Sequence, residues 1–122
     1  MVVKKSIEKA LKKEIVSETF EQIAKVFALT ESRYNCKLSQ LSGERWRAST
    51  AIGYTFGKRI FYSPYKSSNH YFQMSQLPEI IRYLTEHDCL VLLPVGSDEY
   101  IPKCVDECIY ICQKAKSEET AP

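Results

Sequence analysis

The chain has 122 residues, the size of one domain, and its 44% hydrophobic and 26% charged content is typical of a folded globular protein. No stretch approaches the ~18 apolar residues of a membrane helix, and the opening MVVKKSIEKALKKEI lacks the apolar core of a signal peptide. We therefore expect an intracellular domain over residues 1–116, a disordered tail over 117–122, and no membrane partner.

The first predicted element is an amphipathic helix from Lys4 to about Leu29, with a break near Ser17, because apolar residues recur every three to five positions. After Tyr34 the period changes to two. The segments YNCKLSQL and ERWRASTAIGYTF alternate around a turn at Ser42-Gly43, and RIFYS and HYFQM follow. This alternation predicts three or four strands in an antiparallel meander.

Helical spacing returns in QLPEIIRYLTEH, where Pro78 suits the first turn. The continuously apolar CLVLLPV predicts a buried central strand, and a final helix is expected from Pro102 to about Lys114. The predicted fold class is therefore α+β: an N-terminal helix, a three- to four-stranded antiparallel meander, a helix, a buried strand and a C-terminal helix.

This order of elements, with the ending CLVLLPVGSDEYIP, resembles the core of the restriction-endonuclease-like fold, the PD-(D/E)XK superfamily, over roughly residues 5–114. In that family the second and third strands carry an acidic residue and an acid-x-Lys triplet, which hold a catalytic metal ion. The corresponding segments here, RWRASTAIGYTF and RIFYS, contain no Asp or Glu. The resemblance therefore implies at most the nucleic-acid surface, without the catalytic residues.

Charge and aromatic residues concentrate in the middle of the chain. Residues 32–78 hold seven basic side chains against Glu44 alone, together with nine of the fourteen aromatics, whereas residues 79–122 hold four basic and nine acidic side chains. Cations neutralise phosphates and exposed rings stack on bases, so a basic and aromatic sheet face favours DNA or RNA as the partner. An ordinary solvated sheet face is the alternative, because strands favour aromatic residues in any case.

Strand alternation would place Trp46 in the core and direct Arg45 and Arg47 outward together. The candidate nucleic-acid-binding residues are Arg33, Lys37, Arg45, Arg47, Lys58, Arg59, Tyr62, Tyr65, Lys66 and His70.

The segment TFEQIAKVFALTESRYNCKL resembles a helix-turn-helix in the spacing of its apolar residues. In that family the second helix, here capped by Thr30 and running through Leu38, enters the major groove and would present Arg33 and Lys37 to bases. Ala28 stands where the family usually has Gly. A helix followed by a strand over residues 19–38 remains the other interpretation.

The five cysteines are interpreted as reduced thiols, which favours a cytoplasmic location. Cys104, Cys108 and Cys112 share one face of the last predicted helix, and we expect them to pack in the core rather than to bind zinc. No metal or other cofactor is expected, and no nucleophile motif accompanies His70 or His87, so we expect a protein without catalytic residues.

Two alternatives to nucleic-acid binding remain open. The first is a protein-interaction or adaptor domain that forms a homodimer or a hetero-complex, because the basic middle of one copy can pair with the acidic last third of another. The second is a metal-dependent nuclease with relocated acidic ligands, drawn from Glu18, Glu21, Glu44, Asp88 or Asp98.

Overall fold

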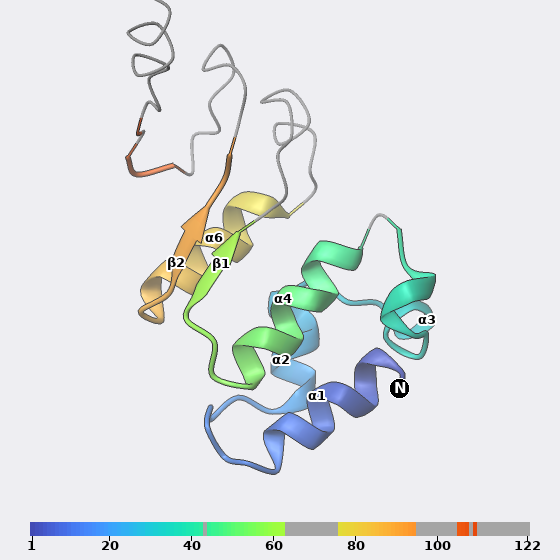
Figure 1. Ribbon diagram of the computed structural model, residues 1–122. Helices are drawn as coiled ribbons and strands as arrows, with labels where there is room; N and C mark the ends of the chain where they lie inside the picture. Colours follow the sequence, from blue (N-terminus) through green and yellow to red (C-terminus); the bar gives the residue numbers. More distant parts are fainter. Residues whose placement is uncertain (43, 63–75, 95–104, 108, 110–122) are drawn as a thin grey trace, which may run out of the picture.

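A computed structural model describes residues 1–42, 44–62, 76–94, 105–107 and 109 (Figure 1). The elements, in chain order, are α1 (Val3–Leu11), α2 (Phe20–Val26), α3 (Glu31–Tyr34), the 3-10 turn η1 (Leu38–Gln40), α4 (Arg45–Thr55), β1 (Ile60–Tyr62), α6 (Leu77–Glu86) and β2 (Leu90–Leu92).

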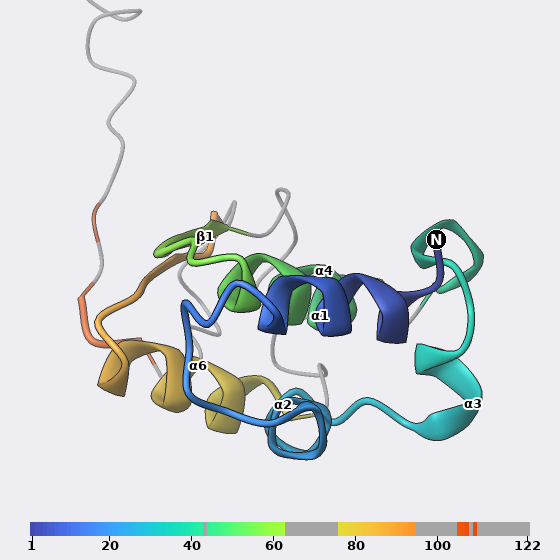
Figure 2. The same ribbon diagram turned by 90° about the horizontal axis from the view of Figure 1, so that it is seen from below.

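The helices form two layers around one apolar core (Figure 2). α1 and α4 lie side by side in one layer, which we call the α1/α4 layer, and η1 and the start of β1 adjoin it. α2, α3 and α6 form the opposite layer. Between the layers lie fully buried side chains from both, including Ile7, Phe27, Ala51 and Leu84.

The predicted antiparallel meander is wrong, because the described residues contain several helices and only two short strands, which run parallel. The segment expected to be the central strand is helix α4. Its fully buried Ala48 and Ala51 lie three residues apart, on one helix face, and Thr55 follows four residues later. Ala is the best helix former, and burial of this face outweighs the strand preference of the neighbouring Thr and aromatic residues.

Of the other sequence predictions, some are confirmed and some fall outside the described residues. The expected break near Ser17 is present, since α1 ends at Leu11 and Thr19 begins α2 with a capping box to Gln22. Among the described segments of the predicted meander, RIFYS is the one that contains a strand, β1. The predicted strand HYFQM and the tail 117–122 lie outside the described residues. So does most of the predicted final helix, whose described residues 105–107 and 109 are not helical.

The two strands belong to a parallel β-α-β unit in which Ile60 pairs with Leu90, Phe61 with Val91 and Tyr62 with Leu92. Parallel strands require a crossover connection, and α6 lies within it. Phe61 and Val91 face inward toward the core. Gly53 of α4 permits this packing, because a Cβ at that position would lie 3.2 Å from the Phe61 ring. Within the described residues, no helix is long and apolar enough to cross a membrane.

Two helix ends use the same hydrogen-bond pattern with different residues in the left-handed position. At the end of α4, Gly57 (φ 92°) occupies this position, and the N–H groups of Gly57 and Lys58 donate to the carbonyls of Tyr54 and Gly53. At the end of α2, Ala28 (φ 53°) occupies it, with equivalent bonds. Both are Schellman motifs, which favour glycine at this position because a Cβ there is strained.

We expect Ala28→Gly to raise the free energy of unfolding by about 0.5–1 kcal/mol, since it relieves left-handed strain at a small entropic cost. The reciprocal change Gly57→Ala should lower it by at least about 1 kcal/mol, because it adds that strain and brings a Cβ within 3.0 Å of Ile15. Urea denaturation followed by circular dichroism measures both. Equal shifts of the same sign would contradict the assignment.

Candidate functional site

Exposed basic side chains gather on the α1/α4 layer. Lys5, Lys9 and Lys12 follow one another at intervals of four and three residues, so they share the face of α1 opposite its buried Val3 and Ile7. The same layer also exposes Lys13, Lys37, Arg45, Lys58 and Arg59, and its exposed acids are Glu8 and Glu14. The opposite layer exposes Lys25, Arg33 and Arg82 against Glu21, Glu31, Glu79, Glu86 and Asp88. The fold therefore separates charge between its two layers.

Two contacts fix the positions of cations at opposite ends of the α1/α4 layer, one through the backbone and one through an aromatic ring. The N–H of Val3 donates to the carbonyl of Cys36 at 2.9 Å, which places Lys37 beside the start of α1. At the other end, the Lys13 ammonium lies 5.2 Å from the Phe56 ring centroid, next to the turn that leads to Lys58. α4 joins these ends and spans roughly 16 Å at 1.5 Å per residue.

Arg45 and Arg47 do not point outward together, because residues two apart on a helix face different directions. Arg45 is exposed, and its guanidinium donates to the carbonyls of Leu41 (2.9 Å) and Ser39 (3.4 Å). Only 15% of the Arg47 side chain is exposed, and its Nη2 lies 2.5 Å from Glu44 Oε1. Arg45 is thus available to a partner at the surface, whereas Arg47 is committed to an internal ion pair.

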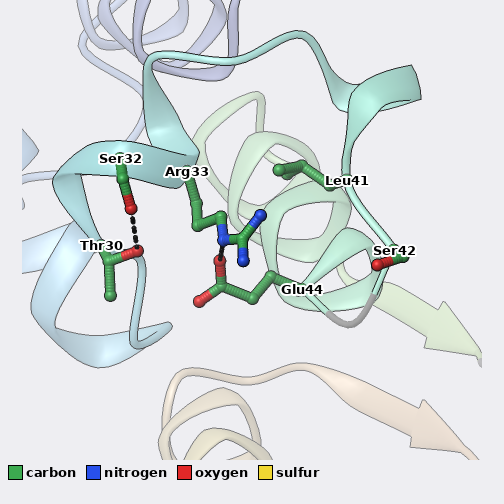
Figure 3. A pocket seen from close by; sticks show the side chains of 6 residues that line it. All are labelled: Thr30, Ser32, Arg33, Leu41, Ser42 and Glu44. Atoms are coloured by element: carbon green, nitrogen blue, oxygen red, sulfur yellow. Dashed lines mark hydrogen bonds and ion pairs between the residues drawn. The ribbon is translucent and has the colours of Figure 1, made fainter.

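Arg33 lines a shallow hollow between α3 and the start of α4 (Figure 3). Its Nε lies 3.4 Å from Glu44 Oε2, so the Glu44 carboxylate stands between the guanidiniums of Arg33 and Arg47. The remaining lining residues are Thr30, Ser32, Leu41 and Ser42. Because Glu44 offsets one of the two positive charges, this hollow is a polar surface rather than a strong anion site.

Residues 19–38 contain two helices joined by a turn, but the second helix is shorter than a helix-turn-helix requires. α3 ends at Tyr34 instead of running through Leu38, and Lys37 lies beyond it. A single helical turn offers little length for insertion into a major groove. Arg33 and Lys37 are therefore placed on different elements, facing the Glu44 hollow and the start of α1 respectively.

The remaining predicted residues lie after α4 or outside the described residues. Lys58 is exposed, and the Arg59 guanidinium lies 5.7 Å from the Tyr54 ring centroid. Tyr62 exposes 68% of its surface on the outward side of β1. Tyr65, Lys66 and His70 lie outside the described residues. Trp46 is half-buried, and its indole N–H donates to the Tyr62 carbonyl at 3.3 Å.

A second polar cluster, which the sequence analysis did not assemble, joins three distant segments. The hydroxyls of Tyr54 on α4 and Tyr83 on α6 both donate to Oε2 of Glu18, the former at 2.5 Å. His87 stacks on Tyr83 with ring centroids 4.0 Å apart, and its Nδ1 donates to the Tyr83 carbonyl at 2.7 Å. The three partners are too far apart in sequence for any local pattern to have indicated the cluster.

The pKa shifts in this cluster indicate a structural role, which is to hold three segments of the chain together. Burial raises the pKa of Glu18, but the hydrogen bonds from both tyrosines outweigh burial, and the pKa lies below its ordinary value. Burial and the hydrogen bond to Glu18 raise the pKa of Tyr83 to about 12, and the same causes raise that of Tyr54. At neutral pH the tyrosines are therefore protonated donors and Glu18 is an ionised acceptor, which fixes the α1–α2 connection to α4 and α6.

Cys89 is not an activated thiol, and the described residues supply no metal site. Burial raises the pKa of Cys89, whose thiol donates to the His87 carbonyl, so it is no thiolate nucleophile at neutral pH. Within these residues, no three His, Cys, Asp or Glu side chains are grouped to hold a metal ion. Among the acids named for the nuclease alternative, Glu18 and Glu44 are engaged as described above, and Asp98 lies outside the described residues.

No family model, curated protein or solved structure matches the chain. The resemblance to the PD-(D/E)XK superfamily therefore stays a prediction from the sequence. The broadest feature of the chain's own surface is the separation of charge between the two layers.

We expect Tyr83→Phe to lower the free energy of unfolding by about 1.5–3 kcal/mol at pH 7, since it removes a donor to a charged group while keeping the ring. The folded pKa of Glu18 is depressed, so its stabilisation is complete above the ordinary carboxyl pKa, about 4.3, and is lost as pH falls through the folded value. The variant's deficit should therefore shrink at low pH. Urea denaturation from pH 7 to 3 measures this.

Tyr62→Phe provides the matched control, because that tyrosine is 68% exposed and lies outside the cluster. A deficit of the same size in both variants, or one that does not change with pH, would contradict the role given to Glu18.

Proposed function

We propose that the protein binds DNA or RNA without catalysis, through phosphate contacts from the exposed cations of its α1/α4 layer. The observation that carries the proposal is the separation of charge between the two layers. Each Lys or Arg that neutralises a phosphate releases condensed counterions, so a layer rich in exposed cations is suited to a polyanion. A cytoplasmic location, inferred from the cysteines, belongs to the same proposal, and the described Cys36 and Cys89 are free thiols.

The contact surface differs from a sheet face in its geometry. Lys5, Lys9 and Lys12 form a row along α1 that covers roughly 10 Å at 1.5 Å per residue. Lys37 and Arg45 lie at the start of the layer, and Lys58 and Arg59 follow α4. Cations spread along a layer fit contact with several phosphates better than recognition of one anion. Contacts of this kind fix position and affinity but carry no base sequence information.

The same separation of charge supports a second candidate, pairing of the α1/α4 layer of one copy with the acidic layer of another. Electrostatic complementarity of this kind governs association rate and orientation, and salt weakens it. A salt-sensitive homodimer without affinity for nucleic acid would favour this candidate over the first.

Fluorescence anisotropy with labelled single-stranded and duplex oligonucleotides, over a salt series, tests nucleic-acid binding. We expect affinity to fall steeply with salt, and Lys9→Glu to weaken binding severalfold while reducing the slope of log affinity against log salt by about 1.

Lys25→Glu is the control for this test. It makes the same charge reversal at an exposed helical lysine of the opposite layer, so it should leave affinity unchanged. Absence of binding at low salt would overturn the proposal. So would equal losses in the two variants, because net charge alone would then account for binding.

A further inference from the structure

The outward side of the two-stranded sheet is apolar and is not covered by the described residues. Ile60 and Tyr62 on β1 expose 66% and 68% of their surfaces, and Leu90 and Leu92 on β2 expose 53% and 45%. Their register pairs Ile60 with Leu90 and Tyr62 with Leu92, so the four side chains form one patch, which we call the outer sheet face. The opposite side of the sheet packs toward the core.

The outer sheet face adjoins the exposed side of the α1/α4 layer. The two strands lie on the same side of α6 as α4 (Figures 1 and 2). The inward-facing Phe61 of β1 packs against α4, because a Cβ on Gly53 would lie 3.2 Å from the Phe61 ring. The outer sheet face is therefore turned away from α6, as is the exposed side of the α1/α4 layer, and a single partner can contact both.

Cations stand where these two surfaces meet. Lys58 and Arg59 directly precede β1, and the Arg59 guanidinium donates to the Lys58 carbonyl at 3.3 Å. The Lys13 ammonium lies 5.2 Å from the centroid of the Phe56 ring, at the end of α4. Asp88 is an exposed acid shortly before β2, so the positive charge lies on the β1 side of the face. A partner at this junction meets cations and apolar side chains within a few residues of each other.

We propose that the nucleic acid bound by this protein is single-stranded and that its bases stack on the outer sheet face. The inference rests on the proposed function, because the same strand would place its phosphates on the cations of the α1/α4 layer. Unpaired bases offer flat faces, and an aromatic ring is a stacking platform for them whatever their sequence. Tyr62 provides the ring, and the neighbouring Ile60, Leu90 and Leu92 extend the apolar surface around it.

A duplex complements the outer sheet face less well. Its bases are stacked on one another and present only their edges in the grooves, where proteins read them mainly through hydrogen bonds. Of the four side chains of the outer sheet face, Tyr62 alone carries a hydrogen-bonding group. The cations of the α1/α4 layer can serve either form of nucleic acid, whereas the apolar face has a complement only in unpaired bases.

Area favours a single strand over a second copy of the chain as the occupant. A fully exposed Leu or Ile offers roughly 100 Å2 and a Tyr roughly 200 Å2, so these four partly exposed side chains offer about 300 Å2 per copy. A standard protein interface buries ~800 Å2 per partner. A single strand does not depend on the face for most of its affinity, because phosphate contacts supply a large share of it.

Fluorescence anisotropy at low salt tests the inference, with a labelled single-stranded oligonucleotide and a duplex of the same sequence. We expect the single strand to bind more tightly than the duplex. Tyr62→Leu should weaken single-strand binding about five- to tenfold and leave duplex binding unchanged, because it removes the stacking ring and keeps an apolar side chain.

Tyr62→Phe is the matched control, because it keeps the ring and should keep the affinity for the single strand. Circular dichroism establishes that both variants retain their helices. Unchanged single-strand binding in Tyr62→Leu, equal losses for the two nucleic acids, or equal losses in the two variants would overturn the inference and leave phosphate binding by the α1/α4 layer intact.

Two other results separate the inference from its alternatives. Absence of binding to either nucleic acid at low salt would overturn the proposed function and the inference together. A dimer in light scattering that Leu90→Asp dissociates would overturn the inference alone and would assign the outer sheet face to a second copy of the chain.

Discussion

Close packing around α4 is the constraint on which the rest of the structure depends. Ala48 and Ala51 are fully buried in the core that α4 shares with α1, and Gly53 leaves room for the Phe61 ring at the sheet. The same helix contributes Tyr54 to the Glu18 cluster, and Arg47 to the ion pair with Glu44. Larger side chains on this helix would separate elements whose contacts produce both the core and the basic layer.

The sequence predicted elements whose signals are local. α6, with Pro78 in its first turn, and β2 lie where helical spacing and a continuous apolar run placed them. The prediction that this second element is a buried central strand is wrong, because within the described residues β2 pairs with β1 alone and leaves Leu90 and Leu92 exposed. The meander failed because alternation over Trp46, Ala48 and Thr50 coexists with the spacing of Ala48, Ala51 and Thr55, which fits a helix. Burial in the tertiary structure favours the helical pattern over the alternating one. The pairing of β1 with a strand thirty residues later has no local sequence signal.

The candidate surface was predictable only in part. Basic composition is visible in the sequence, and exposed Arg45, Lys58 and Arg59 belong to the layer that the fold makes cationic. The row of lysines on α1 is absent from the predicted binding residues, because its contribution depends on which elements lie beside it. Arg47, in contrast, was predicted to bind and is not available, because the Glu44 carboxylate forms an ion pair with it. Glu44 stands at the start of α4, a helix that was expected to be a strand.

The parallel pairing of β1 and β2 has a consequence for the order of folding. Ile60 meets Leu90 only after thirty residues have been brought into a closed loop, and α1 contacts α4 across a longer separation, since α1 ends at Leu11 and α4 begins at Arg45. Contacts between distant residues form slowly because loop closure costs entropy before any contact stabilises it. Loop length therefore does not place the sheet after the helices, but synthesis from the N-terminus does. The ribosome releases α1, α2 and α4 before β2, so we expect these helices to be the surface on which the sheet is assembled.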